Sequence, residues 1–136
     1  MASFRIDGLE ETIRRMEKAG RFGEIAPKAV DAAAPILEGA VRSAVDSAAS
    51  RGYATGDLAG SIRRTKTKMN DRGAYSVVKP NGRDRKGVSN TQKLLGLEYG
   101  NSRQNPHPCL MAATKSVESA CIEAMEEVVR KEMDLE

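Results

Sequence analysis

Three stretches of the chain repeat apolar residues at intervals of three and four positions, the spacing that places side chains on one face of an α-helix. They run from Leu9 to Lys18, from about Pro27 to Ala49, and onward from Pro108. The apolar face of the third stretch carries Leu110, Ala113, Val117, Ala120, Cys121, Ala124 and Val128. The alanines of the second stretch allow another helix to approach closely, and we expect the third helix to pack there.

Pro35 lies in the interior of the second predicted helix. Proline lacks an amide hydrogen, and its ring clashes with the preceding turn, so a helix bends or stops just before it. We therefore expect a kink or a break near Ala32.

The middle of the chain alternates residue by residue, as strands do. Threonine alternates with lysine or arginine from Ser61 to Met69, turn residues fill Asn70 to Gly73, and Ala74 to Lys79 returns as a second strand. This pattern predicts a β-hairpin. Beyond Ile62 neither face of its first strand is apolar, and such a strand protrudes or pairs with something outside the monomer. We expect Asn81 to Gly87 to form a flexible basic loop.

A second region of alternation lies closer to the C-terminus. Leu95, Leu97 and Tyr99 alternate with Gly96 and Glu98, which predicts a half-buried strand with Leu97 and Tyr99 inward and Glu98 outward. Asn90 or Thr91 is expected to cap one helical turn that ends at Leu94. Residues Ser3 to Ile6 are a further strand candidate.

Together these elements predict an α+β fold. We expect residues 1–136 to form one domain, in which two N-terminal helices and a C-terminal helix pack on one face of a small, mostly antiparallel sheet. That sheet would contain the Leu95–Tyr99 strand and the hairpin, which protrudes. The chain has 4% aromatic residues and no Trp, so its core is thin, and contacts with identical neighbours would add buried surface.

The net charge of +3 conceals an uneven distribution. Residues 51–103 contain twelve Lys and Arg against four Asp and Glu, whereas the C-terminal helix is acidic, with Glu118, Glu126 and Glu132 outside its apolar face. Such asymmetry indicates a nucleic-acid partner or contact between the basic arm of one subunit and the acidic face of the next. Aromatic interleaving and DNA-reading helix motifs are missing, which favours a solvated or protein-binding surface. The candidate interface residues are Arg63, Arg64, Lys66, Lys68, Arg72, Arg83, Arg85, Lys86 and Glu98.

Catalytic and metal-binding patterns are weak in this sequence. His107 lies two residues before Cys109, but no fourth ligand for zinc follows at a recognised spacing. Cys109 and Cys121 lie about 18 Å apart along one predicted helix, too far for a disulfide. Glu98 has no second acid spaced for catalysis, and no phosphate-binding glycine loop is present. We expect no enzymatic activity, no cofactor and no metal. No apolar run approaches a membrane span, and no leader opens the chain, so synthesis in the cytoplasm is expected.

Two motifs resemble those of the HK97 gp10-like phage proteins. The first is TGDLAGSI, in which Thr55, Gly56, Leu58 and Ile62 stand at the positions of the family signature. The second combines Glu98, Tyr99 and Gly100 with a polar loop, the Pro106 and Pro108 pair, and an alanine-containing helix. The chain departs from the family at Asn101, where Thr is usual, and at Cys109, where an aromatic residue is common.

The resemblance implies a small structural protein of the virion, located at the head-to-tail junction or tail end after assembly in the host cytoplasm. Such proteins complete or terminate the tail tube by forming a ring, expected to be hexameric, that contacts the tail-tube protein and the head-completion or connector proteins. Genomic DNA would pass through the ring without sequence-specific binding. The alternative is a basic, nucleoid-type DNA-binding protein, which would bind free duplex with strong salt dependence. A small hydrolase would need a convergent polar pocket that the sequence does not supply.

Overall fold

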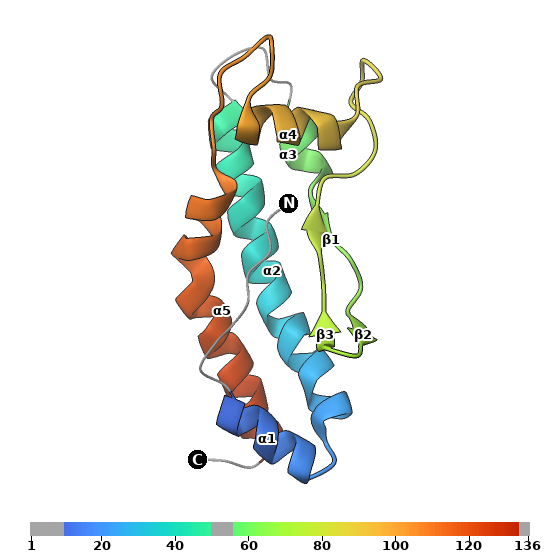
Figure 1. The fold of residues 1–136 in the computed structure, drawn as a ribbon, viewed down its shortest axis with the longest axis vertical. Coiled ribbons are helices and arrows are strands. Elements are labelled where there is room, and N and C mark those ends of the chain that lie inside the picture. Colours follow the sequence, from blue (N-terminus) through green and yellow to red (C-terminus); the bar gives the residue numbers. More distant parts are fainter. Residues whose placement is uncertain (1–9, 50–55, 134–136) are drawn as a thin grey trace.

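The computed structural model describes residues 10–49 and 56–133 (Figure 1). Within these ranges the helices are α1 (Glu10–Lys18), α2 (Phe22–Ala49), α3 (Asp57–Ser61), α4 (Asn90–Tyr99) and α5 (Leu110–Glu132). The strands are β1 (Arg63–Arg64), β2 (Lys68–Asn70), β3 (Gly73–Tyr75) and β4 (Val78–Lys79). The α+β class is therefore confirmed. The predicted strand at Ser3–Ile6 lies outside the described residues.

The long helices α2 and α5 lie side by side, as expected from their apolar faces, and the structure shows that they run in opposite directions (Figure 1). Leu37, Val41 and Val45 of α2 are buried in the same cluster as Leu110 and Cys121 of α5. The predicted face of α5 is wrong in detail, because Ala120 is exposed and Val128 is only half-buried, whereas the neighbouring Val129 is buried. The face rotates by about one position toward the end of the helix.

No break occurs in α2, which begins at Phe22, earlier than predicted, and continues through Pro27 and Pro35 to Ala49. A proline removes one backbone hydrogen bond from a helix, and the tertiary contacts of the helix can offset that loss. Here α5 packs on one side of α2 and the hairpin strands lie along the other (Figure 1). The predicted break near Ala32 therefore does not occur, and a kink there stays a prediction.

The predicted hairpin is present as two short, antiparallel ladders. In the register, Arg63 pairs with Lys79 and Arg64 with Val78 nearer the base, and Lys68 pairs with Tyr75 near the turn. The hairpin lies along α2 and does not protrude, which corrects the sequence-based expectation (Figure 1). The cause is polar. The amide N of Arg64 donates to Glu38 Oε2 at 2.7 Å, and the Thr67 hydroxyl donates to the Asp31 carboxylate, both of which belong to α2.

The predicted strand from Leu95 to Tyr99 is wrong, because these residues form the second half of α4. The helix begins after Ser89, whose hydroxyl accepts a hydrogen bond from the Gln92 amide. Leu94 and Leu97, three positions apart, face the core, whereas Leu95 and Tyr99 are exposed. Apolar residues at 95, 97 and 99 alternate with Gly96 and Glu98, which suggested a strand. The buried face is instead formed by Leu94 and Leu97 at helical spacing.

Candidate interaction surface

The first family-like motif performs a structural task. Gly56 has a φ of +85° immediately before α3, a left-handed conformation that favours glycine, and Thr55 lies outside the described residues. Leu58 and Ile62 retain 6% and 0% of their accessible surface. The predictions that Gly56 needs glycine freedom and that the two apolar residues enter the core are confirmed.

The carboxylate of Asp57, in the same motif, binds the loop that follows β4. Arg85 donates to Asp57 through its backbone N at 3.0 Å and through Nε and a terminal nitrogen at 3.0 and 2.8 Å. Such two-pronged pairing fixes both the position and the orientation of the guanidinium group. Arg85 is thus committed to an intrachain contact, although the sequence marked it as a candidate interface residue.

Asp84 organises the same loop from within. Its carboxylate accepts hydrogen bonds from the backbone N of Lys86 and of Val88, both at 2.9 Å, and from Lys93 Nζ of α4 at 3.0 Å. These hydrogen bonds, first that from the Val88 amide and then that from Lys93, lower the pKa of the Asp84 carboxyl below its ordinary value. The expectation of a flexible loop from Asn81 to Gly87 therefore does not match the structure, in which these bonds hold the loop.

The second family-like motif forms a tight junction between α4 and α5. A Cβ atom placed on Gly100 would lie 2.7 Å from Pro106 Cδ, and one placed on Gly96 would lie 2.8 Å from the Asn101 side-chain nitrogen. The His107 amide donates to the carbonyl oxygen of Leu97. The segment from Gly100 to Pro108 is consequently held against the end of α4.

Glu98 joins the two helices directly. Its Oε2 accepts hydrogen bonds from the backbone N of Cys109 at 2.9 Å and of Leu110 at 3.2 Å, where α5 begins. A carboxylate at a helix N-terminus satisfies free amides and interacts favourably with the helix dipole. The interpretation of Glu98 as a solvated charge is therefore wrong, because its carboxylate caps α5 within the chain, while its role as an interface residue stays a prediction.

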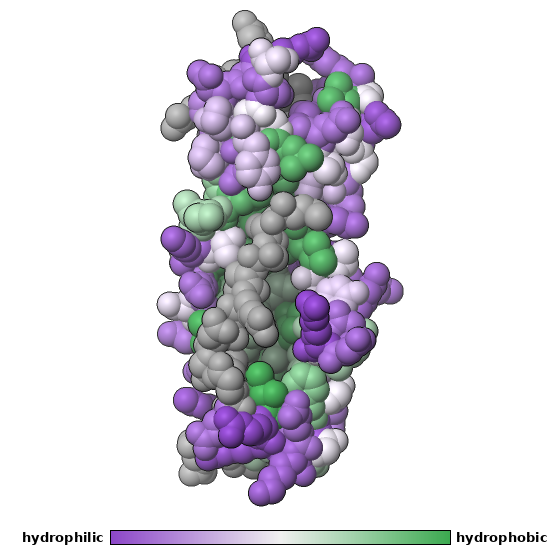
Figure 2. Space-filling model, viewed as in Figure 1, coloured by the Kyte–Doolittle hydropathy of each residue, from purple (hydrophilic) through white to green (hydrophobic). Residues whose placement is uncertain are grey.

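The candidate basic residues separate into two groups. Three of them bind partners within the chain. A terminal guanidinium nitrogen of Arg64 lies 3.3 Å from Glu38 Oε1, Arg85 pairs with Asp57, and Arg83 donates to the Gly87 carbonyl oxygen. The remaining candidates are exposed and form no ion pair with any residue that the structure describes: Arg63, Lys66, Lys68, Arg72 and Lys86. Figure 2 shows hydrophilic residues, with some apolar residues between them, on the side of the molecule where the hairpin and the following loop lie.

The exposed apolar side of α4 was not predicted from the sequence. Leu95 and Tyr99, one helical turn apart on α4, are 44% and 69% exposed, and Met111 at the start of α5 is 70% exposed. Treating Leu94 and Leu97 as a helix face would have revealed it, because residues 95 and 99 then fall on the opposite side. We call Leu95, Tyr99 and Met111 the α4–α5 apolar residues.

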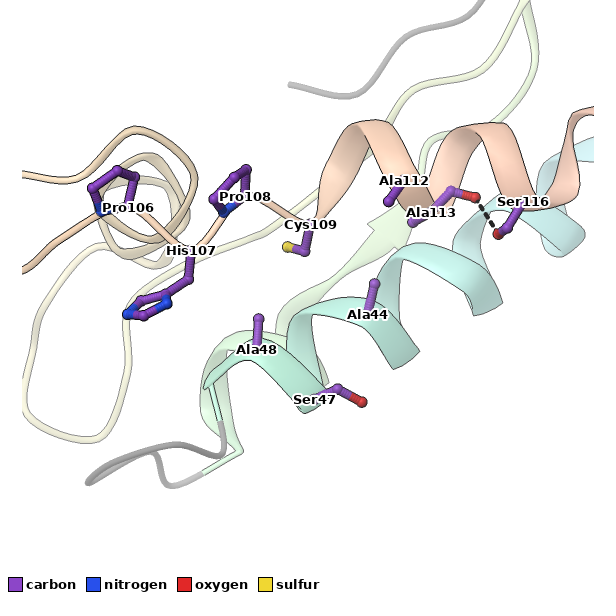
Figure 3. Close-up of a pocket in the computed structure, with 10 residues that line it drawn as sticks. All are labelled: Ala44, Ser47, Ala48, Pro106, His107, Pro108, Cys109, Ala112, Ala113 and Ser116. Carbon is purple, nitrogen blue, oxygen red and sulfur yellow. Dashed lines mark hydrogen bonds between the residues drawn. The ribbon is translucent and has the colours of Figure 1, made fainter.

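A groove of about 600 Å³ lies between the end of α2 and the start of α5 (Figure 3). Ala44 and Ala48 of α2 face the segment that contains His107 and Cys109. Burial, together with the Glu98 carboxylate, raises the pKa of the Cys109 thiol to about 11, whereas a catalytic thiol needs a lowered pKa. No group of three potential metal ligands occurs in residues 10–49 and 56–133. Both cysteines are buried and free.

Comparison with known proteins adds no assignment. No family model, no curated protein and no solved structure matches this chain. Within the described ranges, no helix has the length and apolar character required to cross a membrane.

Proposed function

We propose that this chain is a structural subunit of the head-to-tail junction or tail end of a phage-like particle. Copies of the chain would form a ring, hexameric to match the tail tube, that completes or terminates the tube and joins it to the connector. The two motifs that resemble the HK97 gp10-like proteins support this role. In this chain they hold the loop after β4 and the α4–α5 junction in fixed positions.

The observation that carries the proposal is the exposure of the α4–α5 apolar residues on a rigid support. Gly96 and Gly100 pack closely against the loop after α4, and Glu98 ties α4 to α5. Large apolar side chains on a fixed surface are typical of contacts between subunits. Each Å² of apolar surface that such a contact buries contributes about 25 cal/mol to association. A ring subunit requires such a surface, whereas an enzyme requires convergent polar groups.

The test is assembly of the purified chain, alone and with the tail-tube protein of the same particle, followed by light scattering and electron microscopy. We expect closed rings or rings seated on tubes. The double variant Leu95→Lys and Tyr99→Lys should remain monomeric with an unchanged circular dichroism spectrum, because both side chains are already exposed.

A matched control changes two other exposed apolar residues, Met69→Lys and Tyr75→Lys on the hairpin, which are 45% and 39% exposed. This control should assemble as the wild type does. Wild-type protein that stays monomeric with tube protein present would contradict the proposed function. Normal assembly of the Leu95 and Tyr99 variant would show that the α4 surface is not the contact.

A further inference from the structure

Carboxylates neutralise most of the basic side chains around α2. Arg42 and Arg64 share Glu38, which is 14% exposed, and Arg21 and Lys28 share Glu132. On the hairpin the situation is different. Five exposed basic residues there form no ion pair with any described residue: Arg63, Lys66, Lys68, Arg72 and Lys79. We call these five residues the hairpin cations.

The register of the hairpin places two of these cations side by side. Arg64 and Val78 are directly opposite each other and face α2, since Arg64 bonds Glu38 and Val78 is 4% exposed. Their neighbours Arg63 and Lys79, also directly opposite each other, therefore share the outer face. The Arg63 guanidinium donates one hydrogen bond to the Ile62 carbonyl oxygen, which leaves its charge uncompensated.

Like charges at directly opposed positions of two strands destabilise the pairing. The chain nevertheless places Arg63 opposite Lys79 and adds Lys66, Lys68 and Arg72 on the same hairpin, where Asp71 is the single acidic residue between positions 63 and 79. An external anion with several regularly spaced charges would relieve this repulsion. The phosphate backbone of duplex nucleic acid has that character, with one charge per about 3.4 Å of each strand.

We propose that the hairpin cations bind the phosphate backbone of duplex DNA without reading its sequence. The inner face of the hairpin packs on α2, so the hairpin cannot enter a groove as a free ribbon and read base edges. Lysine and arginine contacts to phosphates supply affinity and orientation but carry no sequence information.

A second copy of this chain is the less suitable partner for the hairpin cations. The acidic residues of α5 are partly neutralised within the chain, since Glu132 pairs with Arg21 and Lys28, and Glu127 with Lys131. The other charged residues of α5 are of both signs: Lys115, Glu118, Glu123, Glu126 and Arg130. The helix therefore offers no concentrated acidic surface to match the hairpin.

The experiment measures binding of the full chain to a fluorescent 30-base-pair duplex of random sequence by anisotropy, at several potassium chloride concentrations. Each phosphate contact contributes about 0.9 to the slope of log K against log salt, so five contacts predict a slope of about −4 to −5. The triple variant Lys66→Gln, Lys68→Gln and Arg72→Gln should reduce the magnitude of that slope by about 3 and weaken binding more than tenfold at low salt.

The matched control is Lys115→Gln, Arg130→Gln and Lys131→Gln, which removes the same net charge from three exposed positions of α5. It should bind DNA with nearly the wild-type slope. Equal loss of binding in both triple variants would overturn the inference, because net charge alone would then explain the affinity. Absence of salt-dependent DNA binding by the wild type would also overturn it. The inference would fail as well if self-association depended on the hairpin cations and DNA binding did not.

This inference goes beyond the proposed function and can stand without it, since free duplex is the probe. The Leu95→Lys and Tyr99→Lys variant separates the two, because its hairpin is unaltered. If the wild type never assembles into rings but binds duplex through the hairpin, the proposed function fails and the DNA contact stands. If rings form and the hairpin variant binds duplex as well as the wild type, the reverse holds.

Discussion

At the scale of single residues, Gly100 has less room for a side chain than any other glycine that the structure describes. Its φ is +76°, and a Cβ atom would lie 2.7 Å from Pro106 Cδ and 2.9 Å from the Pro106 nitrogen. The ring of a proline and its backbone nitrogen cannot move aside as a flexible side chain can. We therefore expect Gly100→Ala to lower the free energy of unfolding by about 1 to 3 kcal/mol, measured by urea denaturation.

Gly39→Ala is the matched control for this substitution. Gly39 lies on the exposed side of α2, and no atom lies within 4 Å of the position where its Cβ would be. Alanine there should raise the free energy of unfolding by about 0.5 to 1 kcal/mol, because glycine disfavours helix. Equal stability of the two variants would show that the Gly100 junction yields to a methyl group at little cost.

The residues of the two family-like motifs differ in how well the sequence predicted their roles. Gly56, Leu58 and Ile62 were predicted correctly, because glycine freedom and core burial follow from residue type and local pattern. The role of Glu98 was not predicted correctly. Its partners are the amides of Cys109 and Leu110, eleven and twelve positions further along the chain, and the sequence gives no sign of which amides a distant carboxylate will meet.

At the scale of elements, α4 shows why a correct pattern led to a wrong assignment. Leu94, Leu95, Leu97 and Tyr99 contain both a period of two and a spacing of three, and short apolar runs do not distinguish strand from helix by periodicity alone. The hydrogen bond between Ser89 and the Gln92 amide marks the helix start and selects the second pattern. Helices α1, α2 and α5 were predicted correctly in type, and in α2 and α5 the helical spacing continues over ten or more residues.

The carboxylate of Asp84 accepts three hydrogen bonds at the loop between β4 and α4. Its carboxyl has a lowered pKa in the folded chain, so the ionised form contributes stability that is present above the unfolded pKa of about 3.9 and is lost as the pH falls through the folded value. We expect Asp84→Asn to be less stable than the wild type near neutral pH. That difference should shrink as the pH falls below about 4.

Urea midpoints at pH 6 and pH 3 measure this effect. Asp46→Asn provides the comparison, because Asp46 is an exposed carboxylate of α2 with no ion pair to any residue in the described ranges. The difference in urea midpoint between Asp46→Asn and the wild type should be the same at pH 6 and pH 3. A constant difference between Asp84→Asn and wild type at both pH values would mean that the loop does not use the charge of Asp84.

At the scale of the whole molecule, buried apolar residues in the described ranges form two clusters. The larger contains Leu37, Val41 and Val45 of α2 and joins α3, α4, α5 and the hairpin. The smaller contains Met16 of α1, Ile25 and Val129, with a few half-buried neighbours. Figure 1 shows α1 at one end of the long α2–α5 pair and α4 at the other. The sequence predicted the helices but not this division, which depends on where α1 and α4 dock.

The division predicts that the molecule does not open uniformly. Proteins unfold locally in cooperative units, and a unit held by few buried apolar contacts opens at lower free energy than the global transition. We expect amides of α1 to exchange with solvent deuterium faster than those around Val41 and Val45 in α2.

Met16→Ala removes a side chain that is 4% exposed and should accelerate exchange in α1 while leaving the amides near Val45 protected. Leu37→Ala, in the larger cluster, should instead lower protection across α2, α4 and α5. It should reduce the free energy of unfolding by about 2 to 5 kcal/mol. Exchange followed by mass spectrometry distinguishes these results, and a uniform loss of protection in Met16→Ala would show that the two clusters unfold as one.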